Sequence, residues 1–214
     1  TKFTATQSAE AFNYMAMAGW DSQQMLDGIE GILNLAAASG EDLGTTSDIV
    51  TDALTAFGLK ASDAAHFSDV LAQSAASANT NVSMMGESFK YVAPIAGAMK
   101  YSVEDTSLAL GLMANASVKG SMAGTSLKTA LANMAAPTDK MATAMKKYGI
   151  SLTDSNGNMK TLKGVLDNLR SSLGGLSETE KTAAASTIFG KEAMSGMLAI
   201  INATESDYNK LADS

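Results

Sequence analysis

The single histidine, His66, is the one imidazole in this 214-residue sequence that could transfer protons. A histidine acts as a catalytic base when a nucleophile and an orienting carboxylate lie beside it, as in the Ser-His-Asp arrangement. No serine-nucleophile signature accompanies His66, and the sequence has neither a second histidine nor a cysteine. We therefore interpret His66 as a surface or packed side chain of a helix.

Carboxylates occur in pairs at Glu104-Asp105 and at Glu178/Glu180, where two acids could share general acid–base chemistry. Each pair also follows a serine that could begin a helix. Acidic residues are favoured in a first turn, because the N-terminal end of a helix carries positive partial charge. We therefore predict that both pairs cap helices, that the chain has no catalytic residues, and that it is not an enzyme.

A possible calcium loop begins at Asp154, because Asp154, Asn156 and Asn158 alternate like the first ligands of such a loop. The loop requires glycine at its sixth position and glutamate at its twelfth. Met159 and Val165 occupy these positions here, which favours an Asn-Gly turn instead.

The 14 methionines offer soft-metal ligands. Flexible thioethers also fill gaps between alanine-rich helices or form an adaptable contact surface, and these uses explain the methionines better. The sequence accordingly predicts no metal and no cofactor. The most conspicuous methionine pairs are Met84-Met85, Met141/Met145 and Met194/Met197.

The composition indicates which elements hold these side chains. Hydrophobic residues make up 46 % of the chain, aromatic residues 6 %, and prolines number only two. Such a sequence favours an all-α fold over a β-sandwich. The net charge of −7, with a single arginine, argues against sequence-specific binding of nucleic acid. No apolar run reaches the ~18 residues of a membrane span, so membrane contact is expected only from regions outside this chain.

Helical spacing of apolar residues, bounded by capping residues and glycines, predicts a series of short helices. Among them are Leu43 to Phe57, Thr138 to Tyr148, Leu162–Leu173 and Lys191–Ala203. The pattern changes once, around the Asn-Gly turn, and there it predicts a small β-hairpin at about residues 150–160. The missing signal peptide and initial Met indicate a piece of a longer protein.

An internal sequence similarity suggests repeated helix pairs, because Ser83–Lys90 is similar to Ser121–Lys128 at an offset of 38 residues. Stacked pairs of about 40 residues would explain it, and chance similarity in alanine-rich sequence is the alternative. Glycines inside the helices, namely Gly86, Gly111 and Gly124, indicate either close packing or a chain that must rearrange. We expect a helical-pair repeat region at 1–137, and a hairpin with C-terminal helices at 138–214 packed on it as one domain.

Four segments together resemble one protein family. The segment Asn115–Lys128, followed by Ala136-Pro137, is similar to the core-region signature of bacteriophage tail tape measure proteins. Residues 78–96, 149–158 and 188–193 are similar to the same family, and their order and spacing add to the resemblance. The similarity covers about residues 20–203.

The resemblance implies a structural protein of a phage, prophage or tail-like particle, made in the host cytoplasm and assembled into the virion. Such a protein occupies the lumen of the tail tube, sets tail length and leaves before the genome is ejected. It implies the tail tube protein, tail assembly chaperones and tail tip or baseplate proteins as partners. Separately, the methionines could form an adaptable contact surface for another copy of the chain, so that self-association is a further expectation.

The sequence leaves two alternatives to a tape measure protein open. A generic α-helical repeat scaffold for protein–protein binding would explain the offset of 38–39 residues. A wall-hydrolase fragment would need a cleft that holds a carboxylate of raised pKa. Within the family, the short glycine-ended helices predict a compact head or initiation module rather than the extended ruler.

Overall fold

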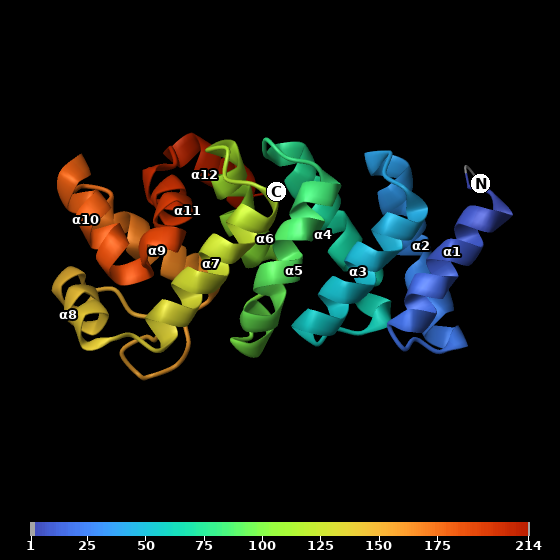
Figure 1. Cartoon of the computed structure of the whole chain (residues 1–214), viewed down its shortest axis with the longest axis horizontal. Helices are drawn as coiled ribbons and strands as arrows, with labels where there is room; N and C mark the ends of the chain where they lie inside the picture. Colours follow the sequence, from blue (N-terminus) through green and yellow to red (C-terminus); the bar gives the residue numbers. More distant parts are fainter. Residues whose placement is uncertain (1–2, 214) are drawn as a thin grey trace.

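A computed structural model describes residues 3–213 as twelve α-helices joined by short connections (Figure 1). The predicted all-α class is confirmed, since 77 % of the chain is helical. A 3-10 turn, η1 (Ala61–Asp63), precedes the fourth helix. In chain order the helices are α1 (Ala5–Met17), α2 (Ser22–Ser39), α3 (Leu43–Phe57), α4 (Ala64–Ser77), α5 (Val82–Ala98), α6 (Val103–Asn115), α7 (Gly120–Ala135), α8 (Asp139–Tyr148), α9 (Leu162–Leu173), α10 (Glu178–Phe189), α11 (Lys191–Asn202) and α12 (Glu205–Ala212).

Local capping explains where these helices begin and end. The side chain before most helices accepts a hydrogen bond from a backbone N–H of the first turn, which otherwise has no partner within the helix. At the other end, left-handed glycines close three helices. The capping side chains belong to Thr4, Asp21, Asp42, Asn81, Ser102, Thr138, Thr161, Ser177 and Thr204, and the closing glycines are Gly40, Gly58 and Gly149.

The first seven helices form two rows. Helices α1, α3, α5 and α7 pack successively against one another, and α2, α4 and α6 form the second row (Figure 1). The helices of the first row begin at residues 5, 43, 82 and 120, at intervals of 38 or 39 residues. The internal similarity between Ser83–Lys90 and Ser121–Lys128 therefore has the same spacing as one helix pair of the structure, as in stacked repeat proteins.

Glycines allow the helices of a row to approach closely. A Cβ on Gly124 of α7 would lie 2.2 Å from the carbonyl oxygen of Ser88 in α5, and one on Gly86 would lie 2.7 Å from Ile49. In the second row, a Cβ on Gly31 would lie 2.6 Å from the Cα of Ala65. Of the two interpretations, close packing is confirmed at Gly86 and Gly124, whereas a Cβ on Gly111 would meet only side-chain atoms, the nearest being those of Leu211 at 3.3 Å.

Aromatic side chains join the rows where they meet. Phe89 of α5 packs edge-on against Phe57 of α3 and Phe67 of α4, with ring centroids 5.8 Å and 5.5 Å apart. All three rings are buried. They form part of a continuous core that extends from Ala11 to Leu211.

The last five helices close the other end of the stack. Helix α11 packs on α7. Helices α9 and α12 both pack on α6, and α10 lies against α8 and α11. Helices α8 and α10 thus lie at the end of the molecule opposite α1 and α2 (Figure 1). No helix in residues 3–213 is both long enough and apolar enough to cross a membrane.

The β-hairpin predicted at residues 150–160 is wrong, because the described residues contain only an isolated antiparallel bridge between Thr153 and Met159. The Asp154 carboxylate instead accepts hydrogen bonds from the backbone N–H groups of Asn156 and Asn158, at 2.8 Å and 2.9 Å. This side chain organises the turn locally. Strands do not extend from it, because an isolated two-stranded ladder is marginal without a third strand.

Candidate functional site

His66 lies on the surface of α4, where its Nε2 is 2.5 Å from Oε1 of Glu104 in α6. Both side chains are more than half exposed. Burial alone would raise the pKa of Glu104, but hydrogen bonds from its own backbone N–H and from His66 outweigh burial and lower that pKa. The pair joins neighbouring helices of the second row, and His66 is a surface side chain, as predicted.

The other predicted capping carboxylates act at helix starts. Glu180 completes a capping box with Ser177, whose hydrogen bonds lower the pKa of the glutamate. Glu178 pairs with Lys181 at 2.9 Å. Asp105, in the first turn of α6, accepts a hydrogen bond of 2.8 Å from the backbone N–H of Lys163 and so fixes the start of α9 against α6.

The methionine pairs each place one member in the core, namely Met85, Met145 and Met197. This arrangement agrees with gap filling between helices. Among the described residues, no group of three or more His, Asp or Glu side chains is placed to hold a metal ion.

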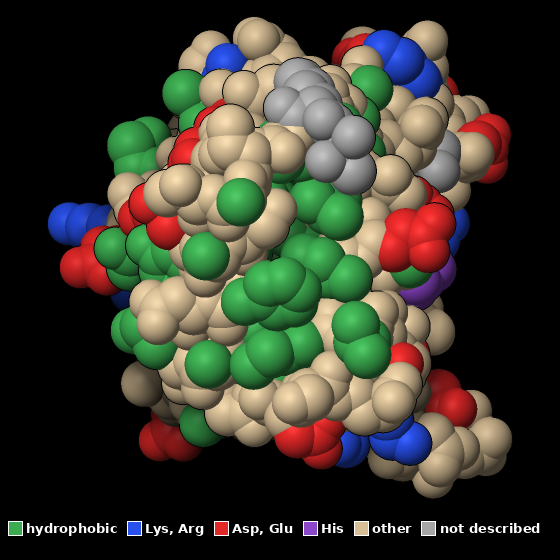
Figure 2. Space-filling model, turned by 90° about the vertical axis from the view of Figure 1, so that its right-hand side faces the viewer, with side chains coloured by type: hydrophobic (Ala, Val, Ile, Leu, Met, Phe, Trp, Pro, Cys, Tyr) green, Lys and Arg blue, Asp and Glu red, His purple; other side chains and the backbone are tan. Residues whose placement is uncertain are grey.

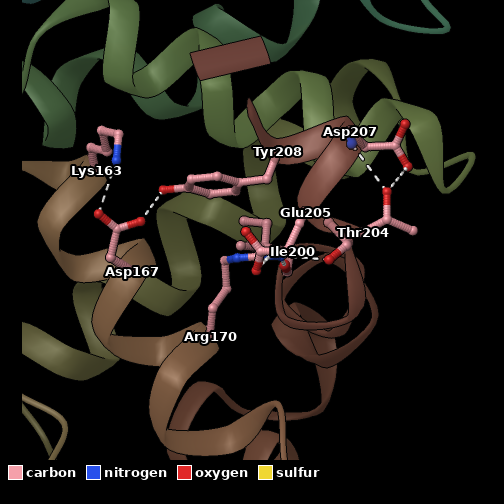
Figure 3. A network of polar contacts seen from close by, with 9 residues as sticks. Lys163, Asp167, Arg170, Ile200, Thr204, Glu205, Asp207 and Tyr208 are labelled. Carbon is pink, nitrogen blue, oxygen red and sulfur yellow. Dashed lines mark hydrogen bonds and ion pairs between the residues drawn. The ribbon is translucent and has the colours of Figure 1, made fainter. Parts of the chain in front are cut away.

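A polar network surrounds Arg170, the only arginine of the sequence, near the end of α9 (Figure 3). One guanidinium nitrogen donates to the carbonyl oxygens of Ile200 and Ala203, at 3.0 Å and 2.8 Å. The other donates to Glu205 at 3.0 Å. Arg170 therefore caps the C-terminal end of α11 and holds the start of α12, and only 11 % of its side chain is exposed.

Tyr208 of α12 completes this network, which we call the Arg170 junction. Its hydroxyl donates to Asp167, which also pairs with Lys163 at 3.0 Å (Figure 3). Burial and the neighbouring Asp167 raise the pKa of Tyr208. The cations of Arg170 and Lys163 lie 4.4 Å and 5.3 Å from the ring centroid, within cation–π distance.

An open groove of about 920 Å³ runs beside the Arg170 junction and is lined by α9, α10, α11 and α12. Its three cations already hold carboxylates, since Lys163 pairs with Asp167, Arg170 with Glu205 and Lys181 with Glu178. This arrangement is suited to joining helices. Sequence reasoning missed it, although a lone arginine in the last turn of a predicted helix was an available indication.

A second surface lies at the opposite end of the molecule. We call the outward side of α1 and α2 the N-terminal face, and the large hydrophobic side chains exposed on these two helices are Phe12, Met17 and Leu26. Figure 2 shows hydrophobic side chains gathered across this end. Leu26 is 64 % exposed and Phe12 36 %, while Ile29 and Leu33 are partly buried. Sequence reasoning gave these helices no functional role.

Comparisons with known proteins place this architecture in a family. Residues 1–190 match the model of the family described as phage-related minor tail protein. The whole chain is 39 % identical to the tape measure protein of Pneumococcus phage Dp-1, of which it spans 18 %.

A second relative is the probable tape measure protein of Escherichia phage P2, which is 29 % identical over 95 % of this chain. The chain spans 25 % of that protein, so both relatives are several times longer than the sequence described here. No solved structure matches the chain. The resemblance to tape measure proteins is confirmed, and the chain belongs to the phage-related minor tail protein family.

Proposed function

We propose that this chain is a structural module of a phage tail tape measure protein and acts in tail assembly without catalysing a reaction. The observation that carries the proposal is similarity along the whole chain to two proteins named as tape measures. The Arg170 junction supports a mechanical role, because its cations Arg170 and Lys163 are paired with carboxylates and join neighbouring helices.

The module is a compact unit within the longer protein rather than a length of the ruler itself. Drawn out as one helix, 214 residues would span about 320 Å at 1.5 Å per residue. The longest helix, α2, has 18 residues and spans only about 27 Å. Folding the chain into stacked pairs uses many residues for little length, which suits a head or initiation module.

In this role the module works with the tail tube protein, the tail assembly chaperones and the tail tip or baseplate proteins. It lies in the lumen of the tail tube and leaves before the DNA. The net charge of −7 supports passage of DNA through the same lumen, because an acidic surface repels phosphates.

An in-frame deletion in a phage that carries this module tests the proposal. One variant lacks the segment corresponding to residues 3–213, and a control lacks an equal length of the same gene elsewhere. We expect the first deletion to abolish or disorganise tails, as seen by negative-stain microscopy. Intact tails shortened by about 1.5 Å per deleted residue would contradict the separate-module role.

The two rows of helices favour a second candidate, a generic repeat scaffold for protein–protein binding. The same deletion distinguishes the two. Tails of normal length, number and infectivity would favour a scaffold with no part in tail assembly, whereas failed assembly favours the tape measure module.

A further inference from the structure

The turn between α8 and α9 contains a pair of residues whose chemistry favours a spontaneous backbone reaction. Asn156 is followed by Gly157, and none of the other ten asparagines of the sequence precedes a glycine. The side-chain amide of an asparagine can be attacked by the backbone nitrogen of the next residue, and a glycine has no side chain that shields this nitrogen. The pair therefore points to deamidation at Asn156.

The structure leaves both reacting groups accessible. Asn156 and Gly157 are exposed, and a Cβ on Gly157 would have no heavy atom within 4 Å. The side-chain amide of Asn156 makes no hydrogen bond within residues 3–213, so its Cγ is free to rotate toward the backbone. The N–H of Gly157 donates to the carbonyl oxygen of Asp154 at 3.1 Å. This hydrogen bond must open before the nitrogen reacts, and it lies in an exposed turn rather than in a helix.

The other asparagines are held in ways that oppose the same reaction. Seven of them lie within helices, where the backbone is fixed by hydrogen bonds and a ring with the next nitrogen cannot form unless the helix opens. Asn158 shares the exposed turn, but its side-chain amide donates to Asp154 at 3.4 Å, and the next residue is Met159. The neighbouring asparagine of the turn is thus an internal reference for Asn156.

We propose that Asn156 is a site of spontaneous deamidation in the folded chain. The backbone nitrogen of Gly157 bonds to Cγ of Asn156 while the bond between Cγ and Nδ2 breaks, and the displaced nitrogen leaves as ammonia with the proton that Gly157 gives up. Water then opens the five-membered succinimide. Opening at Cγ gives aspartate, and opening at the backbone carbonyl carbon gives isoaspartate, in which the chain runs through Cβ and Cγ.

The product changes the tip of the turn and leaves its base in place. A new carboxylate is added two residues from Asp154, which itself accepts the backbone N–H of Asn156 at 2.8 Å, so two negative charges oppose each other there. In isoaspartate one more carbon also enters the backbone and displaces this N–H. At the base, Leu152 is buried and its carbonyl oxygen accepts the N–H of Lys160 at 2.8 Å. The packing of α8 and α9 should therefore persist.

Incubation of the 214-residue chain in mildly alkaline buffer, followed by peptide mass spectrometry, tests the proposal. We expect the peptide that contains Asn156 to gain the mass of an amide-to-acid exchange, and part of the product to be labelled by an isoaspartyl methyltransferase. Asn156→Gln should abolish the gain, because glutamine would have to form a six-membered ring. Asn158→Gln is the matched control, since it removes the neighbouring asparagine and should leave the reaction at Asn156 unchanged.

The same incubation in urea shows what the unfolded sequence allows. An Asn156 that stays unmodified in the folded chain would overturn the proposal, and reaction in urea alone would show that the turn blocks the attack. Equal modification of Asn156 and Asn158 in the folded chain would also overturn it. The modified chain carries one more negative charge, so ion exchange separates it from the unmodified chain. Its midpoint of urea denaturation should be unchanged, and a lower midpoint would contradict an effect confined to the tip of the turn.

Discussion

Arg170 illustrates how single residues join distant parts of this chain. Its guanidinium reaches carbonyls 30 and 33 residues away, and its planar fork serves all three acceptors at once. A lysine has one compact donor group and cannot reproduce this geometry. The junction therefore depends on the shape of the arginine as well as on its charge.

Replacing Arg170 tests this role directly. Arg170→Lys should lower the free energy of unfolding by about 2 kcal/mol, because carbonyls at the end of α11 lose their donor in a partly buried place. Urea denaturation measures the change. Lys140→Ala, at an exposed position of α8, is the control and should shift stability by less than about 0.5 kcal/mol. Equal stability of Arg170→Lys and wild type would refute the capping role.

Asp154 gives the turn before α9 a pH dependence. Hydrogen bonds from the backbone N–H groups of Asn158 and Asn156 lower its pKa below the ordinary value of 3.8. The folded form therefore binds the proton less tightly than the unfolded form, so the stabilisation is present above that value and is lost as pH falls through the lowered pKa. An NMR titration of the carboxyl carbon should show a midpoint below 3.8.

The Asp154→Asn variant provides the control for this titration. Its side-chain amide keeps an acceptor oxygen for the backbone N–H groups but does not titrate. The amide chemical shifts of Asn156 and Asn158 should move with acid in the wild type and stay constant in the variant. A midpoint at or above the ordinary value in the wild type would show that the turn does not hold the carboxylate.

At the scale of the helix, glycines set the distances between neighbours of a row. Gly124 and Gly86 lie at the fifth position of α7 and α5, and both face the preceding helix of the first row. A glycine inside a helix costs about 1 kcal/mol relative to alanine. Close helix contact offsets this cost, because a backbone oxygen of α5 at Gly124, and the side chain of Ile49 at Gly86, lie where a Cβ would stand.

The Gly124→Ala variant separates the effect of helix propensity from the effect of close helix contact. Intrinsic helix propensity alone would stabilise the variant, but the added Cβ would lie 2.2 Å from a backbone oxygen of α5. We expect a net loss of about 1–3 kcal/mol in urea denaturation, typical of an overpacked site. In the control, Gly111→Ala, the nearest atoms are the flexible side-chain ends of Leu211 at 3.3 Å, so the loss should be clearly smaller. A more stable Gly124→Ala would disprove the close contact.

The whole molecule is a stack with two different ends. Helices α3, α4 and α5 have neighbours on both sides within their rows, whereas α1 and α2 pack on one side only among the described residues. In stacked proteins each unit is stabilised by its neighbours, so a terminal unit with one neighbour is held less strongly. The C-terminal end is held instead by α8–α12 and the Arg170 junction.

Hydrogen exchange followed by mass spectrometry should show this asymmetry. Amides of α1 and α2 should exchange faster than those of α5 and α7, because local opening breaks fewer contacts there. Helix α11 serves as the internal reference at the other end and should remain protected. Uniform protection from α1 to α11 would show that the stack unfolds as one unit.

The sequence by itself determined the helical class and most helix ends, because caps and closing glycines act within about four residues of the positions that they define. It also located the Asn-Gly turn, but it wrongly predicted strands there, since strand pairing depends on neighbours that local patterns do not reveal. Only the tertiary structure decided the two rows, the Arg170 junction and the exposed N-terminal face. These features join residues such as Asp105 and Lys163, 58 positions apart, and depend on which side of each helix is covered.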